Sequence, residues 1–117
     1  MHELSIALSL VESADAAARD AGAQRVTGVR LRVGALSGVV TEALRFSFDV
    51  AARGTLLEEA VLTIEELPVV VHCPRCDADV ELPSVQRFRC PVCDTPTGAL
   101  VQGRELELTS LEIEVAE

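Results

Sequence analysis

The chain reads CPRCDADVELPSVQRFRCPVC from Cys73 to Cys93, and this stretch contains all four of its cysteines. They form two Cys-Pro-x-Cys pairs separated by thirteen residues. Each C-x-x-C turn brings two sulfurs within about 3.5–4 Å of each other, so each pair supplies one edge of a tetrahedron around a metal ion. The proline after each first cysteine pre-sets φ for the turn. The spacing therefore predicts one Zn²⁺ bound by Cys73, Cys76, Cys90 and Cys93.

Four protein ligands leave no open position on the predicted zinc ion, so the ion is expected to be structural rather than catalytic. Iron in the same sulfur cage, as in rubredoxin-like proteins, is an alternative that would colour the protein red. Disulfides and a redox-active pair are disfavoured, because cytosolic thiols stay reduced and redox chemistry needs one pair near a βαβ unit. Residues 74–104 contain four of the five prolines, so metal binding is expected to supply most of the stability of this segment.

Composition excludes several classes of protein. The 117 residues include 10 Arg, no Lys and 19 Asp or Glu, and the net charge of −9 argues against a nucleic-acid binder, which needs a basic surface. Hydrophobic residues make up 49% of the chain, which fits a folded protein. No apolar run approaches the ~18–20 residues of a membrane span, and the amino terminus lacks the basic region of a secretory signal. We therefore expect a cytoplasmic protein with no membrane partner.

The negative charge is unevenly placed along the chain. Residues 1–54 contain six Arg and six acidic residues, so the whole net charge lies in residues 55–117. Such an asymmetry indicates either a solvated acidic surface or an acidic face that docks a partner.

Apolar spacing predicts two helices. The first covers residues 4–21 and ends before Gly22; its apolar positions are Leu4, Ala7, Leu8, Val11, Ala14 and Ala18. The second begins at Thr41 and ends before Gly54, with Leu44, Phe48 and Ala51 on one face.

Alternating or continuous apolar runs predict strands at 29–33, 61–67, 69–71 and 105–115. Arg30 and Arg32 fall on the outer face of the first of these strands, where a docking role is an open alternative to simple exposure. In the last strand the alternation changes phase at Thr109-Ser110, which predicts a β-bulge.

The strand at 105–115 has few apolar partners in the cysteine segment, so we expect it to return to the sheet of the first part of the chain. The sequence thus predicts an α+β fold with an inserted lobe. Residues 1–68 and 105–117 form a small domain of two helices and a three-stranded sheet. Residues 69–104 form a zinc-ribbon-like domain inserted into it.

The sequence begins Met1-His2-Glu3, which places a histidine directly after the α-amine. Such a terminus offers three nitrogens in one plane, namely the amine, the deprotonated amide of residue 2 and the imidazole Nδ1. Planar nitrogen donors suit Ni(II) or Cu(II) rather than zinc. The amide of Glu3 or a histidine from outside the terminus could supply the fourth donor. From composition alone, a terminal histidine is more often an exposed bystander.

Taken together, these motifs resemble the HypA family, the nickel metallochaperones of NiFe-hydrogenase maturation and, in some organisms, of urease maturation. The resemblance covers nearly the full length in order. It rests mainly on the Met1-His2-Glu3 start, the two Cys-Pro-x-Cys pairs, and the closing Gly103-Arg104-Glu105-Leu106 with Ser110-Leu111-Glu112.

The resemblance implies a site for each of two metals. Ni²⁺ is expected at the amino terminus as a transient cargo, with His2 as the side-chain ligand and with Met1 and the amide nitrogens of His2 and Glu3 as backbone donors. Zn²⁺ is expected at the four cysteines, one ion per chain.

The resemblance also implies a function without catalysis, namely delivery of nickel to the hydrogenase large-subunit precursor. The implied partners are a HypB-type nickel GTPase, that precursor and urease accessory proteins, and the chain is expected to be a monomer or weak homodimer. An enzyme is independently disfavoured, because the sequence shows no nucleophile–base pair and no phosphate-binding loop. The rival interpretation is a zinc-ribbon adaptor that meets other proteins through its acidic face and has no role in nickel binding.

His72 directly precedes Cys73, and neighbours on an extended chain point to opposite sides. We therefore expect His72 to be solvated or to lie beside the zinc site without binding the ion. A nickel-assisting role and a role as an alternate zinc ligand remain open for it.

Overall fold

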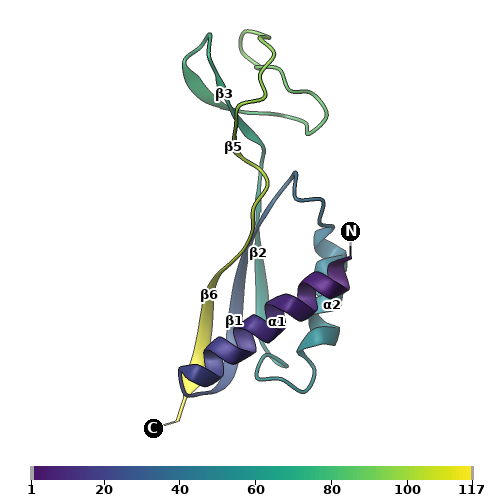
Figure 1. The fold of residues 1–117 in the computed structure, drawn as a ribbon, viewed down its shortest axis with the longest axis vertical. Helices are drawn as coiled ribbons and strands as arrows, with labels where there is room; N and C mark the ends of the chain where they lie inside the picture. Colours follow the sequence, from purple (N-terminus) through teal and green to yellow (C-terminus); the bar gives the residue numbers. More distant parts are fainter. Residues whose placement is uncertain (1, 117) are drawn as a thin grey trace.

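The computed structural model describes residues 2–116, which form two helices and six strands. In chain order these are α1 (Glu3–Asp20), β1 (Ala23–Gly34), α2 (Thr41–Ala52), β2 (Val61–Leu67), β3 (Val70–Cys73), β4 (Ala78–Glu81), β5 (Leu100–Gln102) and β6 (Leu106–Val115). The strands form two three-stranded sheets, with the order β2-β1-β6 in the first and β4-β3-β5 in the second. Figure 1 shows the two sheets following one another along the length of the molecule.

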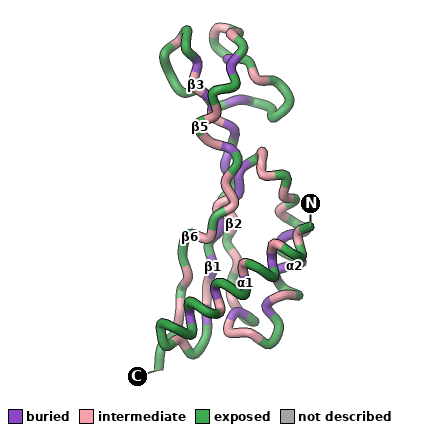
Figure 2. The backbone as a smooth tube through the Cα atoms, viewed as in Figure 1, coloured by how far each residue is buried: buried purple, intermediate pink, exposed green. Residues whose placement is uncertain are grey.

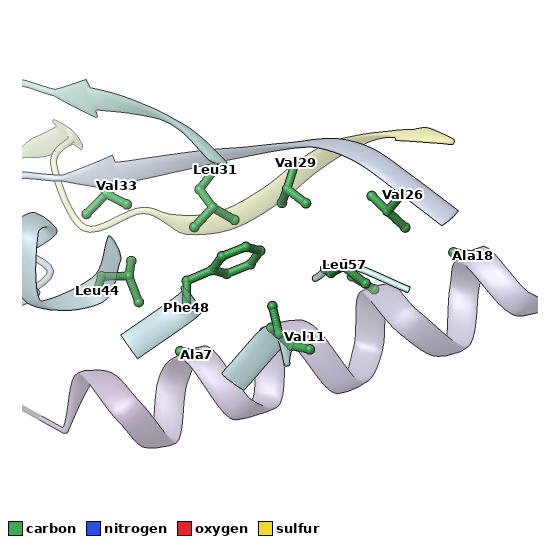
Figure 3. Packing of buried hydrophobic residues seen from close by; sticks show 12 residues of the cluster. Ala7, Val11, Ala18, Val26, Val29, Leu31, Val33, Leu44, Phe48 and Leu57 are labelled. Atoms are coloured by element: carbon green, nitrogen blue, oxygen red, sulfur yellow. The ribbon is translucent and has the colours of Figure 1, made fainter. Parts of the chain in front are cut away.

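Both helices pack on one face of the first sheet. Helix α1 buries the predicted small residues at helical spacing, which are Ala7, Val11, Ala14 and Ala18. Phe48, which is 1% exposed, points from α2 toward Leu31 and Val29 of β1 (Figure 3). The main core is therefore a single layer between the helices and the sheet.

The central strand β1 holds the first sheet together. It pairs in parallel with β2, where Val29 lies opposite Leu62, and antiparallel with β6. Arg30 pairs with Ser110 and Leu31 with Leu108, so Thr109 is an extra residue in β6. The predicted bulge and the predicted return of the last strand to the first sheet are both confirmed.

The second sheet has a small core of its own. Val69, Val71 and Leu82 are buried there, and Leu36, Val80, Phe88 and Leu100 pack against them. The radius of gyration of 17.7 Å exceeds the roughly 13 Å of a compact chain of this length, and the buried residues are spread along the long axis (Figure 2). The α+β fold class is confirmed, whereas the domain boundaries at 68/69 and 104/105 stay a prediction.

Three details differ from the sequence prediction. Leu4 and Leu8 are 47% and 51% exposed, because they lie on the flank of α1, and Ile6 and Leu10 pack against the core in their place. Strand β1 begins at Ala23 rather than at residue 29, because its first residues pair with the end of β6. Strands β4 and β5 were not predicted; with four and three residues they are too short to show a periodic pattern.

Candidate metal centres

The four cysteines converge beside the second sheet. Their Sγ atoms all lie within 4.8 Å of one another. The Sγ of Cys73 lies 3.5 Å from that of Cys93, and the Sγ of Cys76 lies 3.9 Å from that of Cys90. A tetrahedron with Zn–S bonds near 2.3 Å has S···S edges of about 3.8 Å. The thiols therefore fit one tetrahedrally bound ion, with contacts that join the two pairs.

Each cysteine pair lies in a tight turn that ends on an aspartate with a left-handed backbone. Asp77 follows Cys76 with φ of 49°, and Asp94 follows Cys93 with φ of 61°. Aspartate is one of the few residues besides glycine that adopts this conformation readily. Both turns have the sequence Cys-Pro-x-Cys-Asp. The aspartate after each pair is therefore a sequence signal for the turn, and the prediction from the cysteine spacing did not use it.

The thiols differ in how readily they ionise. Hydrogen bonding with the side chain and backbone of Thr95, whose Oγ1 lies 3.1 Å from the sulfur, lowers the pKa of Cys93 to about 6. The pKa of Cys76 is raised to about 12, first by its contact with Cys93 and then by burial. The ionised Cys93 thus disfavours ionisation of Cys76. A divalent cation offsets the repulsion between the thiolates and displaces the thiol protons as it binds.

His72 lies next to the cysteine group in sequence but is not a member of it. Its Nδ1 is 3.0 Å from Oδ1 of Asp79, and its Nε2 is 3.6 Å from Oδ1 of Asp77. The two carboxylates face opposite edges of the imidazole. His72 therefore contacts aspartates on the lobe surface, and its backbone carbonyl accepts a hydrogen bond of 2.6 Å from the Thr97 hydroxyl.

Two of the predicted nickel ligands, His2 and Glu3, lie at the start of α1. Met1 lies outside the described residues. His2 is exposed and is the N-cap of α1, and Glu3 is its first residue. In Figure 1 the start of α1 lies beside the beginning of α2, away from the strands β3 and β5. Among residues 2–116, the cysteine cluster is the one group of three or more metal-ligating side chains close enough to share an ion.

The carboxylate of Glu3 forms a hydrogen bond with a residue 37 positions further along the chain. Its Oε2 accepts a hydrogen bond of 3.2 Å from the backbone N–H of Val40, the N-cap of α2. This bond lowers the pKa of Glu3. No local sequence pattern indicated the contact, because it joins two segments that the fold brings together.

The outer face of the first sheet is polar. Arg32 lies 3.8 Å from a carboxylate oxygen of Glu65 and 3.9 Å from one of Glu107, and Arg30 is exposed on the same face. The predicted outward direction of these arginines is confirmed, and a docking role for them stays a prediction. No helix within residues 2–116 is long and apolar enough to cross a membrane.

Comparison with known proteins gives a consistent result. A family model described as "Hydrogenase/urease nickel incorporation, metallochaperone, hypA" matches residues 1–113. A "Hydrogenase maturation factor HypA" of Chloroflexus aurantiacus is 59% identical over 112 residues, which cover 96% of this chain and 98% of the relative. A protein of the same description from Roseiflexus sp. is 58% identical over 114 residues, covering 97% of this chain and 93% of the relative.

Two solved structures share the fold. The solution structure of the Ni metallochaperone HypA from Helicobacter pylori has a TM-score of 0.68 at 24% identity, and it covers 99% of this chain and all of that one, 100%. A second solution structure, described as HypA protein, has a TM-score of 0.72 at 23% identity and covers 99% of this chain and 98% of that one. These likenesses support the architecture of two helices with two small sheets.

Proposed function

The chain belongs to the HypA family of hydrogenase and urease nickel-incorporation metallochaperones, and on that premise we propose that it binds Ni(II) at its amino terminus and delivers it to the hydrogenase large-subunit precursor. The proposed donors are the amine of Met1, the amide nitrogens of His2 and Glu3, and the imidazole of His2. Membership of the family supports nickel as the cargo, and the exposed start of α1 supports the amino terminus as the binding site.

The observation that carries the proposal is that the N–H groups of His2 and Glu3 precede the first N–H that donates a hydrogen bond within α1. The first such bond of α1 runs from the N–H of Ile6 to the carbonyl of His2, at 3.1 Å. The N–H groups of the first residues of a helix have no partner within it. An amide nitrogen must lose its proton to bind Ni(II), and at residues 2 and 3 that loss breaks no helical bond.

An exposed terminal site suits an ion that must be released. The His2 side chain is exposed, so a ligand on a receiving protein can approach the nickel and replace the donors one at a time. Nickel competes with protons for these nitrogens, so the affinity should fall as the pH is lowered.

We propose Zn²⁺ for the cysteine cage, with a structural role. Four thiolates at tetrahedral spacing favour zinc, and a closed set of four ligands leaves no position for a substrate. Cys73 and Cys90 are buried, which suits a resident ion rather than a cargo. The zinc would join the two cysteine turns and fix the lobe formed by β3, β4 and β5.

The proposal includes no catalytic step. A HypB-type nickel GTPase, the hydrogenase precursor and urease accessory proteins are the proposed partners. The proposed location is the cytoplasm, and the proposed state is a monomer or weak homodimer.

The test is the metal content and Ni(II) affinity of the wild type, His2→Ala and His72→Ala. We expect the wild type to hold one zinc and one nickel per chain. His2→Ala should keep the zinc and lose nickel affinity by at least about tenfold, because one donor of the set is gone. His72→Ala is the matched control, since it removes the other histidine, which contacts aspartates, and should bind nickel like the wild type.

A short extension before Met1 separates this proposal from the adaptor interpretation. The extension removes the free amine, so nickel transfer to the precursor should be lost while protein contacts made elsewhere persist. Unchanged nickel binding in His2→Ala, or unchanged transfer by the extended chain, would leave the adaptor as the better interpretation.

A further inference from the structure

The hydrogen bond between Glu3 and Val40 connects the proposed nickel site to a fixed part of the fold. The Oε2 atom of Glu3 accepts the N–H of Val40 at 3.2 Å. Val40 is the N-cap of α2 and has no side-chain oxygen to cap the helix. The Glu3 carboxylate therefore lies at the positive end of the α2 dipole, where a negative charge is favoured.

The loop that carries Val40, residues 35–40, is itself held in place. The N–H of Ala35 donates to the carbonyl of Leu67 at 2.9 Å, and the N–H of Leu36 donates to the carbonyl of Gly103 at 2.6 Å. The side chain of Leu36 packs against the core of the second sheet. Glu3 is thus bonded to a loop anchored on two other chain segments.

We propose that Glu3 is a positioning residue for nickel: its carboxylate holds the start of α1 against the loop 35–40, and residue 3 gives the metal its amide nitrogen and not its carboxylate. This inference rests on the proposed function. The amine, the two amides and the imidazole must lie near one plane around the metal, and a free chain end pays conformational entropy to reach that arrangement. The bond to Val40 fixes residue 3 beforehand and so lowers that cost.

The geometry separates positioning from direct ligation. A carboxylate that accepts the Val40 N–H is replaced in that role by the side-chain amide of glutamine, which keeps an oxygen acceptor. A carboxylate that binds the metal as an anion is not replaced in this way. Glu3→Gln should therefore bind nickel within about threefold of the wild type, whereas Glu3→Ala should lose roughly tenfold in affinity.

Removal of the donor gives the second arm of the experiment. Val40 has φ of −86°, close to the value that proline requires, so Val40→Pro deletes the N–H without a large change of backbone. Val40→Ala is the matched comparison, because both variants lose the valine side chain and only proline lacks the N–H. We expect Val40→Pro to bind nickel roughly tenfold more weakly than Val40→Ala. Combining it with Glu3→Ala should add almost nothing, since both changes remove the same bond.

The readouts are the Ni(II) dissociation constant and the ligand-field absorption of the nickel-loaded protein. We expect the absorption bands to stay in place in every Glu3 and Val40 variant, because the donor atoms are unchanged. Glu42→Ala, which removes an exposed carboxylate from the first turn of α2, should match the wild type in both readouts.

Three results would overturn the inference. They are a shift of the absorption bands in Glu3→Gln, a loss in Glu3→Gln as large as in Glu3→Ala, and equal affinities in Val40→Pro and Val40→Ala. If Val40→Pro fails to fold, as judged by loss of bound zinc, the two Glu3 variants still decide the question. Failure of the proposed function has a different signature, because the wild type and His2→Ala would then bind nickel alike.

Discussion

A Cβ atom added to Gly34 would lie 2.2 Å from the carbonyl carbon and oxygen of Gly103, so the backbones of these two glycines touch where the two sheets meet. Two hydrogen bonds surround the contact: the N–H of Gly34 donates to the carbonyl of Glu105 at 2.7 Å, and the N–H of Leu36 to that of Gly103 at 2.6 Å. Gly103 has φ of 142°, which L side chains rarely adopt. The junction is therefore a backbone contact with no room for a side chain.

Gly34→Ala should destabilise the protein by at least about 2 kcal/mol, because the new methyl group can be accommodated only if the backbone at the junction moves. Urea denaturation measures the change in the free energy of unfolding. Gly98→Ala is the control, since a Cβ there meets nothing within 4 Å, and it should stay within about 0.5 kcal/mol of the wild type. Equal stabilities of the two variants would show that the junction is looser than the structure indicates.

Local sequence patterns predicted the helices and strands whose apolar side chains recur at the spacing of one buried face. The apolar spacing of α1 and the phase change at Thr109 were readable because a helix face and a strand face repeat at fixed intervals. The cysteine spacing indicated a metal cage because each C-x-x-C turn places two sulfurs close together. The helix and strand patterns show which side of each element is buried.

Contacts between segments far apart in the sequence could not be predicted. The approach of Gly34 to Gly103 and the bond from Val40 to Glu3 depend on how the two sheets and two helices pack. Neither leaves a periodic pattern in the sequence. The exposure of Leu8 has the same origin, because helical spacing alone does not show where the apolar stripe of α1 ends relative to the sheet.

Thr95→Val should weaken zinc binding by roughly 10–100-fold, because it removes the hydroxyl beside Cys93 Sγ. Since Thr95 lowers the pKa of Cys93 to about 6, its loss raises that pKa and lets protons compete better with zinc. The deficit should therefore be large near neutral pH and should shrink as the pH rises toward the ordinary thiol range. Competition with a chromophoric chelator at several pH values measures this.

Thr63→Val is the matched control for Thr95→Val. Thr63 is exposed on the outer face of β2, so its substitution should leave zinc affinity unchanged at every pH. A Thr95→Val protein whose zinc affinity equals that of the control would show that the hydroxyl does not support the thiolate.

Zinc removal should unfold the two lobes unequally. The second sheet rests on a core of three buried residues, whereas the first has twelve. After chelation, amide hydrogen exchange should become fast in β3, β4 and β5 and stay slow in β1 and α1, because the main core does not depend on the metal. Adding zinc back should restore protection. Loss of protection in β1 at the same chelator concentration would mean that the chain unfolds as one unit.

The location of the bound nickel tests the central claim most directly. Crystals grown with Ni(II) and measured on both sides of the nickel absorption edge distinguish nickel from zinc in anomalous difference maps. Nickel is predicted on the nitrogens of the first three residues and the imidazole of His2, with zinc among the four cysteine sulfurs. A nickel peak inside the sulfur cage, or at any other place while His2 binds no metal, would contradict the claim.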